Sequence, residues 1–306
     1  RTSRVQTMLL LASLLTSIAL ILPQEEASAT PAGTSETVRS FLLDAESALY
    51  DPTAEGLRSL SFVIPVALQR SDLDQMLAPM GQKLPADTPE TIRLGETSVA
   101  WELDGVPQVD GVVAETFPAA LAMMRGQIQA SLAPMGHQVL SAALNQMVSF
   151  APMLEGFDAD FDGADGDDLR VVFQRKPGVP ATTIPADSIT WTFDTEDNLP
   201  TGNTMSFSQE GPMGEMQVTL ATRYEWKPAR GDSGKLILAA VDATNELGSF
   251  ATMKQRTEYQ HEDRDGVMVL TSYKETMSQK TPMGSAPEVV KQVTLEFLVV
   301  NGGADG

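Results

Sequence analysis

The second half of the chain alternates between apolar and polar residues over successive segments, and this period of two restricts the fold most. Side chains of a β-strand point alternately to the two faces of a sheet, so the pattern predicts strands. Turn-forming pairs such as Asp197-Asn198 and Asp265-Gly266 separate the segments. Consecutive strands with short turns predict an antiparallel meander. The predicted strands are 169–175, 188–195, 203–209, 215–226, 235–242, 251–262, 266–278 and 288–300.

Helical periodicity is concentrated in the first half. A helix is predicted from Ser35, whose side chain can cap it, with Val38 and Leu42 on one face. Two more helices are predicted within 116–150, meeting at the Pro-Met-Gly break at 134–136. Strands are also predicted at 60–68 and on both sides of the turn at 104–105. The predicted class is therefore α+β, with an antiparallel, strongly curved sheet packed against helices from the N-terminal half.

The first residues resemble an export signal. Arg1 and Arg4 precede an uncharged run from Met8 to Leu22, and Ala27-Ser28-Ala29 has the small residues of a signal-peptidase site. The run is shorter than the roughly 20 residues that span a bilayer. We expect residues 1–29 to be a cleaved signal peptide, with an uncleaved anchor as the alternative. Cleavage would leave no stable membrane span and a periplasmic or extracellular protein.

The remainder, 30–306, is predicted to be a single α+β domain. It divides into a helix-rich part at 30–156, an acidic hinge at 157–168 and a β-meander at 169–306. The absence of cysteine favours a bacterial periplasm or envelope over a eukaryotic extracellular setting. A net charge of −20 repels phosphate backbones and anionic lipid headgroups, so nucleic-acid binding is not expected.

Six aspartates lie within FDADFDGADGDDL at 157–169. Asp158, Asp160, Asp162 and Gly163 match the opening of an EF-hand calcium loop, in which oxygen ligands alternate before a tight glycine turn. The position that should supply a bidentate glutamate is Leu169. Two interpretations remain open: a calcium site at Asp158, Asp160 and Asp162, completed by a later aspartate, and a solvated hinge, which we favour.

No catalytic motif is convincing. GDSG at 231–234 is similar to the nucleophile loop of trypsin-like proteases, but the chain has only two histidines, His137 and His261, and neither lies in a matching motif. A tight turn between strands explains the same residues. With no cysteine and two separated histidines, a zinc or copper centre also lacks its usual ligands. A non-enzymatic protein without a cofactor, apart from the calcium considered above, is predicted.

Three features together resemble the exported lipoprotein carriers of the LolA/LolB-like superfamily. They are the helix from Ser35, the strand within Leu57–Arg70, and the strands that end in LEFLVV, preceded by a W-x-F-D…L-P segment. The segment comprises Trp191, Phe193, Asp194, Leu199 and Pro200. The resemblance implies a half-barrel-like meander closed by helices, with acyl chains carried on its inner face. It suggests Arg58 as the cavity arginine that members of the family use.

The leading hypothesis is therefore an exported, non-enzymatic carrier or binder of a hydrophobic ligand, such as a lipid or acyl chain. The alternative is a cell-envelope structural or interaction protein, stabilised by calcium at the aspartates and bound to an envelope partner. A high methionine count, 15, suits an adaptable apolar surface, although methionine in place of leucine in a plain core is the explanation that we favour. The candidate cavity residues are Phe62, Ile64, Met124, Ile128, Met147, Trp191 and Phe193.

Overall fold

A computed structural model describes residues 34–77, 84–116, 122, 125–180, 184–211, 214–229, 234–282, 284–286 and 288–301. The fold is α+β and its sheets are antiparallel, as predicted. The helices are α2 (Glu36–Ser47), α3 (Arg70–Leu77), α4 (Arg125–Ala143) and α5 (Ala151–Gly156). The strands are β1 (Ser59–Gln69), β2 (Thr91–Glu102), β3 (Gln108–Val113), β4 (Phe157–Asp165), β5 (Asp168–Arg175), β6 (Ser188–Asp194), β7 (Pro200–Gly211), β8 (Gly214–Pro228), β9 (Leu236–Leu247), β10 (Ala251–Arg264), β11 (Val267–Thr281), β12 (Gly284–Ser285), β13 (Val289–Thr294) and β14 (Glu296–Val300).

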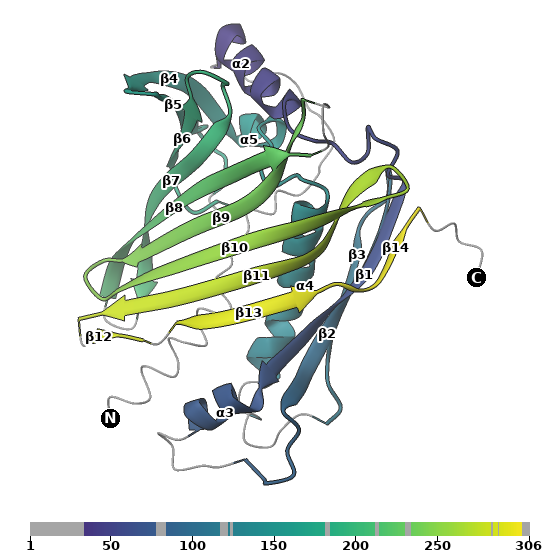
Figure 1. Cartoon of the computed structure of the whole chain (residues 1–306). Helices are drawn as coiled ribbons and strands as arrows, with labels where there is room; N and C mark the ends of the chain where they lie inside the picture. Colours follow the sequence, from purple (N-terminus) through teal and green to yellow (C-terminus); the bar gives the residue numbers. More distant parts are fainter. Residues whose placement is uncertain are drawn as a thin grey trace.

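The strands of the described residues form two sheets (Figure 1). The large sheet runs in chain order from β4 to β12, and β13 pairs with the same edge of β11 as β12, the edge that faces away from β10. The small sheet has the order β14-β1-β2-β3. The predicted last strand, 288–300, is wrong as a single unit, because it divides at Leu295. Its first part extends the large sheet and its second part pairs with β1.

Helix α4 packs between the two sheets. One apolar cluster contains Phe62 of the small sheet, Leu140 of α4 and Val269 of the large sheet, all nearly fully buried. In Figure 1, α4 lies behind the large sheet, on the side of β1 and β2. This shared core makes both sheets and the helix one packed unit.

The prediction that α4 breaks at Pro134 is wrong, because one helix continues through this residue. A proline inside a helix removes one backbone hydrogen bond and costs about 3 kcal/mol. Contacts with the small sheet offset this cost. The Thr97 hydroxyl donates a hydrogen bond to the Leu132 carbonyl at 3.0 Å, and Gly136 packs directly against Val109. Tertiary packing therefore overrides the local helix-breaking signal.

The predicted acidic hinge is also wrong, because residues 157–165 form strand β4, which pairs with β5. Phe157, which precedes the first aspartate, and Ala159 are buried. The ring of Phe161 meets that of Phe41 on α2 edge to face. The apolar residues alternate with the aspartates, so the segment carries a strand pattern that its charge obscures. The meander therefore begins at residue 157, before the predicted 169.

Within the described part of the chain, no helix is both long enough and apolar enough to cross a membrane. The predicted signal peptide, 1–29, lies outside the described residues.

The large sheet holds a half-buried histidine, His261 on β10, whose two ring nitrogens are buried. Neither ring nitrogen has a hydrogen-bonding partner among the described residues. Burial, with a smaller effect of the nearby Lys227 ammonium, lowers the pKa of His261 to about 3. In the unfolded chain the pKa of His261 is about 6.5, so the unfolded state binds the proton first as the pH falls. The folded state therefore loses stability between about pH 6.5 and about pH 3.

We expect His261→Leu to remove this pH dependence. Between about pH 7.5 and about pH 5, the wild-type free energy of unfolding should fall by about 2 kcal/mol more than that of the variant. Urea unfolding at both pH values measures the difference. The matched control is His137→Gln, which replaces the second histidine of the chain, located on α4. It should show the same pH dependence as the wild type. Parallel pH profiles for wild type and His261→Leu would contradict the prediction.

Candidate ligand-binding cavity

A cavity of about 260 Å³ lies between α4 and the face of the large sheet that packs on it, which we call the inner face. From Gln127 to Ala142, α4 lines it with residues spaced alternately by three and one, which is one stripe of a helix. Pro134, Met135 and Val139 supply apolar surface from this stripe. The side chains of α4 at the cavity include no ionisable group.

The inner face contributes two neighbouring rows of side chains across β10, β11 and β13. Tyr259 lies opposite Tyr273 in one row. In the next row, Thr257 lies opposite Glu275, and Glu275 lies opposite Lys291. All five line the cavity. A polar and charged set from the sheet therefore faces a largely apolar helix surface.

Glu275 is a carboxyl group held in a poorly solvated environment. Burial raises the pKa of Glu275, and the Lys291 ammonium and a hydrogen bond from Gln255 oppose this shift. The Gln255 amide donates to the Glu275 carboxyl at 2.5 Å. The neutral acid is therefore favoured more than in an exposed glutamate.

The pKa of Lys291 is shifted in the opposite direction from that of Glu275. Burial lowers the pKa of Lys291, and the neighbouring Glu275 carboxylate opposes the change. Its side chain is half-buried, because it lines the cavity. Lys291 makes no hydrogen bond or ion pair with any other described residue.

The two tyrosines complete the polar lining. Tyr259 and Tyr273 are each 7% exposed. Burial raises the pKa of both, followed by the effect of the Glu275 carboxylate. Both hydroxyls therefore stay protonated, and neither has a hydrogen-bonding partner in the described part of the chain.

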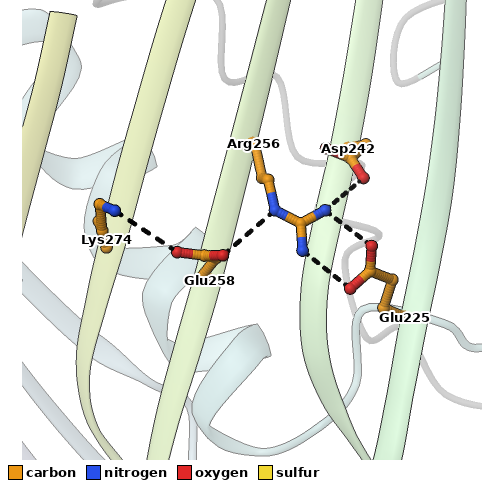
Figure 2. Close-up of polar contacts among 5 residues, drawn as sticks. All are labelled: Glu225, Asp242, Arg256, Glu258 and Lys274. Atoms are coloured by element: carbon orange, nitrogen blue, oxygen red, sulfur yellow. Dashed lines mark hydrogen bonds and ion pairs between the residues drawn. The ribbon is translucent and has the colours of Figure 1, made fainter.

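The opposite, outer face of the large sheet carries five charged side chains that pair with one another (Figure 2). The Arg256 guanidinium binds both oxygens of Glu225, at 2.7 and 2.8 Å, and an oxygen of Asp242 at 2.7 Å. Glu258 joins Arg256 to Lys274, whose ammonium lies 3.8 Å from it. The hydrogen bonds from Arg256 are the main cause of the lowered pKa of Glu225. These five outer-face charges are thus paired with one another, whereas the donors of Lys291, Tyr259 and Tyr273 at the cavity make no hydrogen bond with a described residue.

The predicted cavity residues occupy the core. Phe62 and Ile64 belong to the cluster between the sheets, Ile128 to the cluster between α4 and the small sheet, and Trp191 and Phe193 to the cluster under α2 and α5. Met147 packs at the edge of the first cluster, and Met124 lies outside the described residues. None of the six described candidates lines this cavity.

The correction has a physical cause, because apolar periodicity marks burial and does not separate a core from a cavity wall. A more specific signal was present. Glu275 and Lys291 stand in phase with the apolar positions Tyr273 and Val293 of their strands. Charged residues on the buried phase of a strand point to a polar site inside the fold.

The calcium candidates do not converge. Asp158 and Asp160 are alternate residues of β4 and project from one face. Asp162 lies where the pairing of β4 with β5 shifts register, so the regular alternation of faces ends before it. Asp158 lies 4.0 Å from the Lys176 ammonium. Across the described residues, no three histidine, cysteine or acidic side chains are grouped so as to hold a metal ion.

Two other candidates came from the sequence. Arg58 is exposed, just before β1, and its backbone N–H donates to the Asn301 side chain. Ser233 of the GDSG stretch lies outside the described residues.

Comparison with known proteins finds no family model, no curated protein and no solved structure that matches this chain.

Proposed function

We propose that the protein is a non-enzymatic binder or carrier of a small amphiphilic molecule, which it holds between α4 and the inner face of the large sheet. The cavity lined by apolar α4 residues on one side and by Tyr259, Tyr273, Glu275 and Lys291 on the other carries this proposal. Ligand sites typically combine apolar walls with a few polar groups that fix orientation.

The size of the cavity limits the ligand. At about 260 Å³, it exceeds the ~150 Å³ cavity that accommodates benzene and falls just below the ~300 Å³ of small drug sites. By that comparison it accommodates about ten carbon-sized groups. The ligand is therefore a medium-length amphiphile or one end of a longer acyl chain.

The wider architecture fits the same role. An antiparallel meander with α4 packed against one face provides a sheet and a helix between which an apolar chain can be held. We propose that the predicted signal peptide delivers the protein to the periplasm, where it binds its ligand and transfers it to or from an envelope partner. The alternative, a calcium-stabilised interaction protein, has less support because no three acidic or histidine side chains of the described residues are grouped around one point.

Filling the cavity tests the function. Ala130 lines the cavity yet is exposed on α4, so Ala130→Trp can occupy the space without straining the core. With the uncharged fluorescent probe N-phenyl-1-naphthylamine, we expect saturable binding to the wild type and affinity at least about tenfold weaker in Ala130→Trp. Fluorescence titration of the probe gives both dissociation constants.

Ala100→Trp is the matched control, because Ala100 is an exposed strand residue of β2 that does not line the cavity. It should bind the probe like the wild type. Equal loss in both variants, or no saturable binding to the wild type, would reject the proposed site.

A further inference from the structure

The polar lining of the cavity includes hydrogen-bond donors that no described residue satisfies. The Lys291 ammonium offers three N–H groups, and the Tyr259 and Tyr273 hydroxyls offer one each. No described residue accepts a hydrogen bond from any of these three side chains. The carboxyl of Glu275 is the acidic group at the site, and it already accepts the hydrogen bond from Gln255. A ligand that supplies acceptors would satisfy these groups.

Among the described residues, one cation and one acid line the cavity, and only the acid has a hydrogen-bonding partner. Lys291 is the cation, and the α4 stripe and Val66 of β1 add no charge. Glu275 lies directly opposite Lys291 and accepts a hydrogen bond from Gln255. The Lys291 ammonium makes no hydrogen bond or ion pair with a described residue, so an anionic ligand would supply its missing partner.

We propose that the ligand is an amphiphilic monocarboxylic acid, whose carboxylate binds the Lys291 ammonium and the two tyrosine hydroxyls while its apolar chain lies along α4. This inference rests on the proposed function and adds the chemical class of the ligand. The net charge of −20 gives an anion no long-range attraction. Recognition of a carboxylate must therefore come from these short contacts, which are charge-assisted hydrogen bonds.

Three ten-carbon ligands separate the headgroup from the chain. Decanoate, decan-1-ol and decylamine can each compete with N-phenyl-1-naphthylamine, and they differ mainly in charge. For the wild type we expect decanoate to bind at least about tenfold more tightly than decan-1-ol, because one charge-assisted hydrogen bond contributes about that much. Decylamine should bind most weakly, because its ammonium would lie beside that of Lys291.

Variants of Lys291 test the contact itself. Lys291→Met removes the charge and keeps the length of the side chain, so decanoate affinity should fall about tenfold while decan-1-ol affinity stays within about twofold. Lys291→Arg should retain most of the decanoate affinity. Lys274→Met removes an equal charge from the neighbouring strand, but on the outer face, and should change neither affinity.

The outcomes separate the two proposals. Equal affinity for decanoate and decan-1-ol, or a decanoate affinity unchanged in Lys291→Met, would overturn the carboxylate inference and leave the binding function standing. Tighter binding of decylamine than of decanoate would overturn it in favour of a cationic ligand held by Glu275. A protein that binds neither the probe nor decan-1-ol would overturn both proposals. Circular dichroism of each variant verifies the fold.

Discussion

Replacing Gly111 with alanine is expected to lower the free energy of unfolding by about 3 kcal/mol, because strand β3 and helix α4 touch at this residue. A Cβ atom at position 111 would lie 2.4 Å from the Cβ of Leu132 and 3.2 Å from its Cδ1. Leu132 is 1% exposed, so its side chain has no free space to enter. The helix or the strand would have to move.

Other contacts oppose such a movement. The carbonyl of Gly111 accepts a hydrogen bond from Gln129 at 2.8 Å, and Thr97 donates to Leu132. At Gly136 the helix meets Val109 just as closely. Since α4 also forms one wall of the cavity, displacing it should weaken binding of the neutral probe together with stability.

Gly126→Ala provides a control with the opposite sign. Gly126 is a glycine of α4, the helix that contacts Gly111. A Cβ atom at position 126 would have no neighbour within 4 Å. Alanine is the better helix former by about 1 kcal/mol, so this variant should be slightly stabilised. Urea unfolding of both variants measures the difference. If Gly111→Ala unfolds at the wild-type urea concentration, the close packing of α4 on β3 described here is wrong.

The second large effect is expected at Asn145, just beyond the end of α4. We expect Asn145→Ala to lower the free energy of unfolding by about 3 kcal/mol. The Asn145 amide donates to the Tyr50 carbonyl at 2.8 Å, and its oxygen accepts from the backbone N–H of Leu238 at 3.2 Å. The side chain thus joins three chain segments in a site where it is only 5% exposed. Its loss would leave buried backbone groups unpaired.

The backbone conformation of Asn145 makes a second contribution to the free energy of unfolding. A glycine variant separates it from the contribution of the side-chain hydrogen bonds. Asn145 has φ 55, a left-handed conformation that costs alanine about 1 kcal/mol and costs glycine little. Asn145→Gly should therefore be about 1 kcal/mol more stable than Asn145→Ala, while both remain well below the wild type. Chemical denaturation of the wild type and the two variants gives the side-chain and backbone contributions to the free energy of unfolding. Stability of Asn145→Gly equal to that of the wild type would show that the side-chain hydrogen bonds contribute nothing.

The local sequence pattern predicted secondary structure correctly where a single local preference acted. The segment from Ser188 to Asp194 alternates strictly between buried and half-buried residues, and it forms β6 as predicted. The pattern failed where a local signal competed with packing. Pro134 predicted a helix break, yet contacts with Thr97 and Val109 keep α4 continuous. The aspartates of β4 predicted a solvated hinge, yet the alternating Phe157, Ala159 and Phe161 make the same residues a strand.

The sequence by itself determined the α+β class and the antiparallel order of most strands, because the period of two and the turn residues act over a few neighbouring positions. The tertiary structure alone decided which buried residues face a cavity. That depends on the register that places Glu275 between Thr257 and Lys291, and on α4, which comes from far earlier in the chain. A wall built from segments more than a hundred residues apart has no local signature, and so the candidate site emerged only when those segments were packed together.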